Sequence, residues 1–388
     1  MIKGIRYYSL LNCGYGDAAL TYIEGLLEQN IPLRWSPLVN TQWGLAPWRL
    51  LPNDWRPDIS EMATGTKNRE AILQCLEQDI DYDVVFLHTI PEPWPKLVES
   101  DRINIGYTVW ETDRLPAHWP EVLNSVEHIC VPCEFNHELF SFGEGRAVSV
   151  VPHAIDKPLY KNTDQDRHEY KRKRGIGDGV YIFYVIATWD PRKSMSETLR
   201  TFLRAFDADD KVCLLVKTDE KVAGDRAVSD IVAEIQSEFS NAPEVVLIAE
   251  RVSSREIQLI HEISDCFFSL THCEGWGLGA FSAAATGNPV IITGWGGQLD
   301  YLPDDISYHV RYVLNAVQEK SDWASYDKSQ NWAYADTDDA RKILRHCYQN
   351  RQEAKEKGLA LKAFVNDRYS AEKVTGDLLR AINDAHTR

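Results

Sequence analysis

Short apolar runs alternate with amphipathic stretches along almost the whole chain of 388 residues. Apolar runs rich in valine and isoleucine predict strands that are buried on both faces of a sheet. The stretches between them repeat apolar residues at helical spacing, and parallel strands need crossover connections of this kind. The alternation therefore predicts an α/β protein built from βαβ units around parallel sheets.

The predicted elements fall into two halves of the chain. In the first half, strands are expected at residues 5–10, 33–38, 84–87, 103–109, 129–131 and 148–151, with helices at residues 18–28, 68–78 and 121–125. In the second half, strands are expected at residues 180–186, 212–216, 245–248, 266–270 and 289–292, with helices at residues 195–206, 228–239, 254–263 and 278–285 and two or three more after residue 338.

The stretch between the halves, residues 152–178, is rich in charge, proline and glycine, which is typical of a linker between two independently wound sheets. Residues 39–65 have no clear periodicity and predict a long loop. We therefore predict a Rossmann-like domain at residues 1–165, a second at residues 166–368, and a terminal helix at residues 369–388 that crosses back to the first domain.

Charge and composition narrow the function classes. The net charge of −16 argues against a nucleic-acid partner, and the basic run from Lys171 to Arg174 allows at most a peripheral membrane contact. No apolar run approaches the roughly 20 residues that span a bilayer, and we recognise no signal peptide. Eight cysteines at irregular spacings fit a reducing compartment, and no cluster has zinc spacing. We expect a cytoplasmic protein without a metal.

The segment from Leu270 to Ile292 is the strongest candidate for a binding site. A strand ends near Glu274, glycines follow, and a helix of small residues begins near Leu278. In open α/β sheets, ligands bind at the carboxyl ends of the strands, where helix N-terminal amides favour anions. A carboxylate there accepts hydrogen bonds from sugar hydroxyls, while the amides hold a diphosphate.

A second glycine turn, Gly14-Tyr15-Gly16, follows the first predicted strand and matches G-x-G-x-x-A. Such a turn lets a ligand approach the backbone closely. A dinucleotide site also needs an acidic residue about 20 positions on, and residues 35–40 contain none. A purely structural turn and a ligand-facing turn both stay open.

The segment that begins at Glu274 resembles the donor-site signature of the retaining family 4 glycosyltransferases. This resemblance implies the GT-B architecture, in which two Rossmann-like domains face each other across a cleft. It also implies that Glu274 contacts hydroxyls of the transferred sugar and that Ser282 stands where the family has a glutamate for the nucleotide ribose. The donor-binding turn and helix start would then comprise Gly275, Gly277, Leu278 and Gly279.

Residues 186–194 resemble the strand, loop and helix in which that family clamps the donor diphosphate. Lys193 falls on the family lysine, and Thr188, which is expected to bind the donor, stands where the family has an arginine. The resemblance therefore implies that Arg192 or Lys217 supplies the second cation. Glu111, at the end of a predicted strand, is expected to orient or deprotonate the acceptor.

Together these features predict a retaining hexosyltransferase of polysaccharide biosynthesis. It would move a hexose from a nucleotide-diphosphate sugar to a hydroxyl of a sugar or a lipid-linked sugar. We expect Glu274, Lys193 and Glu111 to be catalytic, with Gly14 and Gly16 on the donor. No cofactor or metal is expected, because cationic side chains and amides supply the charge that a metal otherwise would.

Two alternatives stay open. One is a GT-B nucleotide-sugar epimerase or a phosphorylase. The other is a degenerate transferase that acts as a binding subunit without catalysis, which Ser282 and Thr188 suggest, since both depart from the family pattern.

Overall fold

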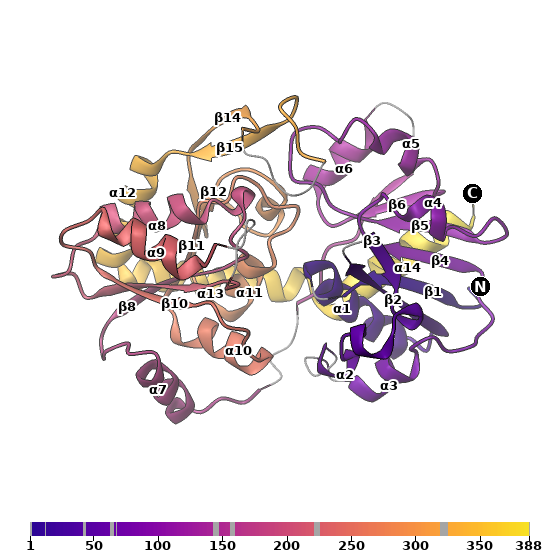
Figure 1. Cartoon of the computed structure of the whole chain (residues 1–388), viewed down its shortest axis with the longest axis horizontal. Helices are drawn as coiled ribbons and strands as arrows, with labels where there is room; N and C mark the ends of the chain where they lie inside the picture. Colours follow the sequence, from indigo (N-terminus) through magenta and orange to yellow (C-terminus); the bar gives the residue numbers. More distant parts are fainter. Residues whose placement is uncertain are drawn as a thin grey trace. The chain divides into compact units, whose positions relative to one another are not determined.

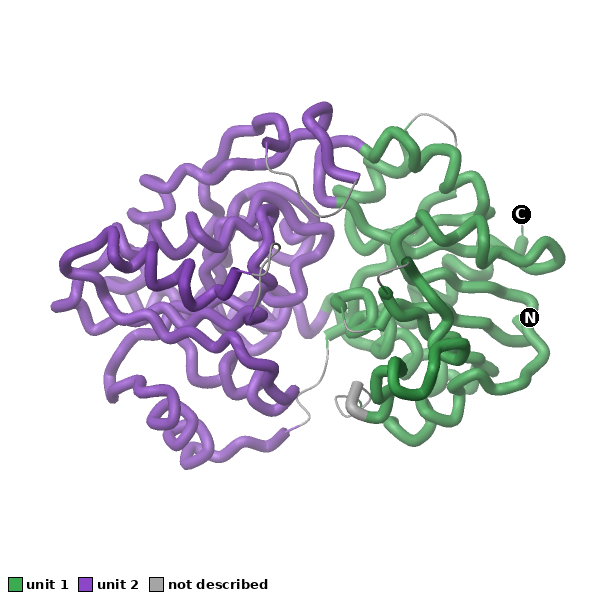
Figure 2. The backbone as a smooth tube through the Cα atoms, viewed as in Figure 1, with its two compact units in different colours: residues 1–110, 115–159, 368–388 green, residues 111–114, 160–367 purple. Residues whose placement is uncertain are grey.

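The computed structural model describes residues 2–11, 13–41, 44–62, 66, 68–142, 147–155, 160–220, 226–318 and 325–387. The chain divides into two compact units (Figure 2). Unit 1 comprises Met1–Trp110, Leu115–Leu159 and Arg368–Arg388, and unit 2 comprises Glu111–Arg114 and Tyr160–Asp367.

Unit 1 is built on a seven-stranded sheet in the order β3-β2-β1-β4-β5-β6-β7, in which every pairing of the described strands is parallel except that of β2 with β3 (Figure 1). Its strands are β1 (Ile5–Leu10), β2 (Leu33–Thr41), β3 (Gly44–Pro47), β4 (Val84–His88), β5 (Ile103–Tyr107), β6 (His128–Val131) and β7 (Val148–Val150). Its helices are α1 (Gly14–Glu28), α2 (Ile59–Met62), α3 (Arg69–Gln74), α4 (Trp94–Leu97), α5 (Trp119–Leu123), α6 (Glu134–Ser141) and α14 (Ala371–His386).

Helix α1 follows β1 directly and packs closely against it. A Cβ atom on Gly16 would lie 2.6 Å from the backbone oxygen of Leu10, so a larger residue would push the helix off the strand. Further along α1, Gly25 lies against Thr375 of α14. The last helix of the chain therefore packs on the first helix and belongs to unit 1.

Unit 2 has a six-stranded parallel sheet in the order β10-β9-β8-β11-β12-β13 and a two-stranded antiparallel sheet of β14 and β15. The strands are β8 (Tyr181–Ile186), β9 (Val212–Lys217), β10 (Glu244–Ile248), β11 (Cys266–Ser269), β12 (Val290–Thr293), β13 (Tyr308–Val310), β14 (Tyr312–Ala316) and β15 (Asn331–Ala335). The helices are α7 (Asp164–Lys173), α8 (Met195–Ala205), α9 (Val228–Ser237), α10 (Ser254–Ile263), α11 (Leu278–Thr286), α12 (Thr337–Gln349) and α13 (Arg351–Arg368).

The predicted α/β class with parallel sheets is confirmed, and each predicted strand overlaps an observed one. The domain boundaries and the facing arrangement of the domains stay predictions. Two stretches differ from expectation. Residues 152–178 are not only a linker, because α7 lies within them, and residues 39–65 are not only a loop, because β3 pairs with β2 there.

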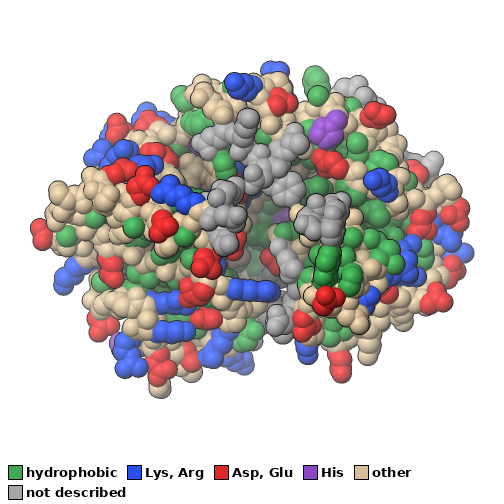
Figure 3. Space-filling model, in the orientation of Figure 1, with side chains coloured by type: hydrophobic (Ala, Val, Ile, Leu, Met, Phe, Trp, Pro, Cys, Tyr) green, Lys and Arg blue, Asp and Glu red, His purple; other side chains and the backbone are tan. Residues whose placement is uncertain are grey.

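Helix α7 escaped prediction because only Tyr170 on it is buried, so it has no apolar stripe. A capping box starts it, in which the side chains of Thr163 and Asp166 each accept from the other's backbone N–H. The basic run at its end is partly neutralised by carboxylates: Arg174 pairs with Glu250 at 2.6 Å and Lys173 with Glu256 at 3.5 Å. Figure 3 shows acidic and basic side chains interspersed over the visible face of each unit.

Within the described residues, no helix has both the length and the apolar character that a membrane crossing needs. The same part of the chain holds no group of three or more side chains that could ligate a metal ion.

Candidate functional site

Two loops meet at the carboxyl edge of the unit 2 sheet. Strands β8 and β11 are parallel neighbours, so the loops that follow them leave the sheet at the same edge. The first loop carries Thr188, Arg192 and Lys193, and the second carries Glu274. The backbone N–H of His272 donates to the carbonyl oxygen of Arg192 at 2.8 Å and joins the two loops. The two sequence motifs therefore form one site.

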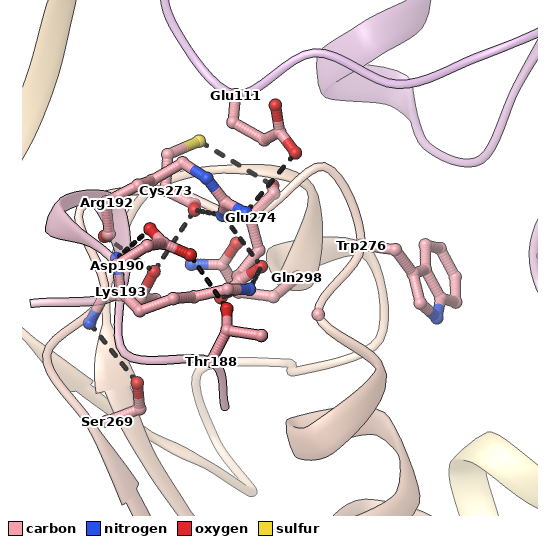
Figure 4. A network of polar contacts seen from close by, with 12 residues as sticks. Glu111, Thr188, Asp190, Arg192, Lys193, Ser269, Cys273, Glu274, Trp276 and Gln298 are labelled. Atoms are coloured by element: carbon pink, nitrogen blue, oxygen red, sulfur yellow. Dashed lines mark hydrogen bonds and ion pairs between the residues drawn. The ribbon is translucent and has the colours of Figure 1, made fainter. Parts of the chain in front are cut away.

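Glu274 lies at the centre of this site (Figure 4). Its two carboxylate oxygens accept from Nζ of Lys193 at 2.8 and 2.6 Å, and one of them accepts from Nη1 of Arg192 at 3.1 Å. The three side chains are only 11, 17 and 14% exposed for Glu274, Lys193 and Arg192. The predicted carboxylate and its cations thus form a largely buried ion cluster.

Arg192 is held from several sides. Its Nη1 also donates to the backbone oxygen of Cys273 at 2.6 Å, and its Nη2 lies 3.6 Å from a carboxylate oxygen of Glu111. Burial lowers the pKa of Arg192, but the negative groups around it, Glu111 first, outweigh burial, and the pKa lies well above the usual value. The guanidinium therefore stays charged.

Opposing effects also act on Glu274. Burial raises the pKa of its carboxyl, while the charges and hydrogen bonds of Lys193 and Arg192 lower it, and the net result lies below the ordinary value of 4.5. Glu274 is consequently ionised at neutral pH. An ionised carboxylate can accept hydrogen bonds from hydroxyl groups but cannot donate a proton.

The cation-bearing turn is shaped by Asp190 and Thr188. The Asp190 carboxylate accepts from the backbone N–H of Lys193 at 3.2 Å and from the hydroxyl of Thr188 at 2.8 Å. Pro191 then begins a short 3-10 turn, η4 (Pro191–Lys193), that carries Arg192 and Lys193. Thr188, predicted to bind the donor, is therefore engaged within the loop and helps to hold Asp190.

The glycine turn after Glu274 depends on small residues. Gly277 has a φ of +88°, a left-handed conformation that side chains disfavour, and a Cβ atom there would lie 3.1 Å from Cγ of Glu274. A Cβ on Gly279 would lie 2.7 Å from the backbone oxygen of Ile186. These contacts bring the start of α11 against the end of β8. Gly275 is buried, whereas Leu278 and Ser282 on α11 are half-buried.

Lys217 ends β9, beside β8, and its carbonyl oxygen accepts from the backbone N–H of Ala187 at 3.1 Å. Lys217 is a buried residue, and its Nζ donates to the carbonyl oxygen of Thr218 at 2.7 Å. Burial lowers the pKa of this amine. Lys217 therefore lies on the predicted edge, but its Nζ donates to the backbone of the next residue, Thr218.

Gly14 and Gly16 lie in unit 1, at the start of α1, so the ion cluster of unit 2 does not include them. Gly14 is exposed and Gly16 is buried against Leu10. The close packing of Gly16 agrees with a structural role of this turn, and their predicted donor contact stays a prediction.

Sequence reasoning did not identify two side chains of the site. Asp190 carries the turn, and its place before a proline was the one available signal. Tyr326 donates its hydroxyl to Glu111 at 2.8 Å, across 215 residues of sequence. No local pattern marks a contact between residues so far apart.

No protein-family model matches the chain. The D-inositol 3-phosphate glycosyltransferase of Actinosynnema mirum is 25% identical over 181 residues, which are 46% of this chain and 42% of that protein. The chain thus aligns with less than half the length of this curated relative.

Solved structures match nearly the whole chain at low identity. HepE of Anabaena in complex with UDP-glucose has a TM-score of 0.68 at 11% identity and covers 99% of this chain and 100% of its own. A glycosyltransferase of Rickettsia africae has a TM-score of 0.67 at 12% identity, covering 99% and 98%. Sucrose-phosphate synthase of Thermosynechococcus elongatus has a TM-score of 0.65 at 12% identity, covering 99% and 100%. The similarity shows that the chain has the α/β fold of the GT-B glycosyltransferases, as predicted.

Proposed function

We propose that the protein is a glycosyltransferase that takes a hexose from a nucleoside-diphosphate sugar and passes it to a hydroxyl acceptor with retention of configuration. The observation that carries the proposal is the cluster of Glu274, Lys193 and Arg192 at the carboxyl edge of a parallel sheet. A carboxylate suits the hydroxyls of a sugar, and an adjacent cation suits a diphosphate. A nucleotide sugar carries both groups side by side.

In the proposed reaction, the bond between the anomeric carbon and the diphosphate oxygen breaks, and the acceptor oxygen bonds to that carbon on the same face. The acceptor proton passes to the departing diphosphate. Lys193 stabilises the charge that develops on the leaving group, and the amides at the start of α11 assist. Glu274 orients the sugar through its hydroxyls.

The donor nucleotide is best sought first among uridine diphosphate sugars, because HepE is solved with UDP-glucose. The partial match to a D-inositol 3-phosphate glycosyltransferase supports transfer to a hydroxyl acceptor. We propose a sugar or a lipid-linked sugar as acceptor, in polysaccharide biosynthesis in the cytoplasm, with no metal or cofactor.

The test is release of nucleoside diphosphate from UDP-glucose and GDP-mannose, with and without simple sugars and lipid-linked sugars as acceptors. Acceptor-dependent release supports the proposal, and NMR of the product shows whether the anomeric configuration is retained. Release of nucleoside diphosphate without an acceptor product would contradict the proposed transfer. A product of inverted configuration would contradict the proposed retention.

A binding subunit without catalysis is the second candidate. Thr188 stands where the resembled family has a phosphate-binding arginine, and its hydroxyl donates a hydrogen bond to Asp190. This observation favours the binding subunit. Binding of UDP-glucose in calorimetry together with no transfer to any acceptor would support this alternative.

A further inference from the structure

The segment Glu111–Arg114, here called the strap, belongs to unit 2, although its flanking residues Trp110 and Leu115 belong to unit 1. The strap is a compact turn. The hydroxyl of Thr112 donates to the carbonyl oxygen of Arg114 at 2.7 Å and accepts from its N–H at 3.3 Å. Thr112 is fully buried. The segment therefore has a defined shape.

Asn331, the first residue of β15, donates hydrogen bonds to Asp113 of the strap. One carboxylate oxygen of Asp113 accepts from the backbone N–H of Asn331 at 2.6 Å, and the other accepts from its side-chain amide at 2.8 Å. Parallel hydrogen bonds to the two oxygens of one carboxylate fix its orientation, and the negative charge strengthens both. Asp113 is thereby locked to unit 2.

Glu111, two residues earlier, reaches the ion cluster from this anchored strap (Figure 4). One of its oxygens accepts from the hydroxyl of Tyr326 at 2.8 Å, and the other lies 3.6 Å from Nη2 of Arg192. The side chain of Glu111 is 16% exposed. Through Nη1, Arg192 in turn holds Glu274.

We propose that Asp113 and Asn331 form a positioning pair for the donor site. They fix the strap so that Glu111 holds Arg192, and Arg192 sets the orientation in which Glu274 meets the donor sugar. This inference rests on the proposed function. It also gives Glu111 a different role from the predicted acceptor base, because its oxygens are already engaged by Tyr326 and Arg192.

The pair offers a charge-swap test. In Asp113→Asn, the negative charge of the pair is lost, and the second hydrogen bond persists only when the amide of Asn331 turns over to present its oxygen. The double variant Asp113→Asn, Asn331→Asp restores a donor facing an acceptor at that position and returns the negative charge to the pair. The first variant should lose function, and the double variant should recover it.

The experiment measures two quantities on wild type, Asp113→Asn, the charge swap and the exposed control Asp178→Asn, whose side chain is 90% exposed. The first is the affinity for UDP-glucose relative to that for UDP, by calorimetry. The second is kcat and KM for transfer. Asp113→Asn should lower both the relative affinity for UDP-glucose and kcat about tenfold, because a small displacement of the group that orients the sugar slows the reaction. The affinity for UDP should stay unchanged.

A second measurement, in a Glu274→Gln background, separates a positioning role of Asp113 from a purely structural role. If Asp113 acts through Glu274, then Asp113→Asn should cause no further loss of kcat in a Glu274→Gln background, since coupled residues are non-additive. Additive losses, an equal loss of UDP affinity, or wild-type values for Asp113→Asn would overturn the inference. If the wild type binds UDP-glucose but transfers no sugar, the proposed transfer fails. The affinity for UDP-glucose relative to UDP then tests the positioning pair by itself. A chain that binds neither ligand overturns both.

Discussion

Replacement of Glu274 by glutamine should act in opposite directions on nucleotide binding and on sugar transfer. In the free protein, Glu274 neutralises Lys193, with Nζ 2.8 and 2.6 Å from its oxygens, and shares Arg192 at 3.1 Å. A diphosphate must therefore compete with this carboxylate for Lys193. Glu274→Gln removes the competitor and one negative charge that would face the phosphates.

The size of the gain follows from the charge removed. A unit charge about 6 Å from a phosphate, at an effective dielectric constant of about 20 for a largely buried site, contributes about 2.8 kcal/mol. This corresponds to about 100-fold tighter binding of UDP. Loss of a charge-assisted hydrogen bond to a sugar hydroxyl in the transition state costs about 1.5–3 kcal/mol, so kcat for transfer should fall about 10- to 100-fold, while the tighter diphosphate binding acts on KM.

Calorimetry with UDP and an assay of UDP release from UDP-glucose measure the two effects. Glu197→Gln is the matched control, because it removes the same charge from α8, where Glu197 pairs with Arg204 and is 40% exposed. The control should leave both quantities unchanged. Weaker or equal UDP binding by Glu274→Gln, or undiminished transfer, would refute the reasoning.

Three further predictions concern single residues. Lys193→Met should weaken UDP binding about 10- to 100-fold in calorimetry, because it removes the proposed phosphate cation, and unchanged affinity would exclude Lys193 from that role. Gly279→Ala should lower the free energy of unfolding by about 1–3 kcal/mol in urea, because its Cβ would lie 2.7 Å from the oxygen of Ile186, and an unchanged midpoint would contradict this packing. Burial lowers the pKa of His153 from 6.5 to about 3, so this residue contributes stability that is complete above pH 6.5 and is lost as pH falls toward 3. His153→Gln should flatten the fall of the unfolding free energy over that range, and an unaltered pH dependence would show that His153 is not responsible.

The fold and the centre of the site were accessible from the sequence for a physical reason. Glu274 and Lys193 both follow apolar strand patterns, and parallel strands end at one edge of a sheet, so their meeting follows once β8 and β11 are neighbours. The family resemblance singled out Lys193 and Glu274, and the shared edge of the parallel strands gives the physical reason why the two side chains meet.

Other contacts lay beyond sequence reasoning. The bond of Tyr326 to Glu111 depends on the path of the strap, which no periodicity encodes. Thr188 could be aligned with a donor-binding position, but its engagement by Asp190 is set by the geometry of one turn. Only Tyr170 of helix α7 is buried, so this helix lacks the periodic apolar pattern by which other helices are predicted.

The central claim is that a donor diphosphate takes Lys193 from Glu274 and leaves that carboxylate to the sugar. A crystal structure of the protein with UDP-glucose tests it most directly. We predict phosphate oxygens within hydrogen-bond distance of Nζ of Lys193, and the carboxylate of Glu274 on hydroxyls of the glucose. A nucleotide bound elsewhere, or bound while the ion pair of Glu274 and Lys193 stays closed, would contradict the account.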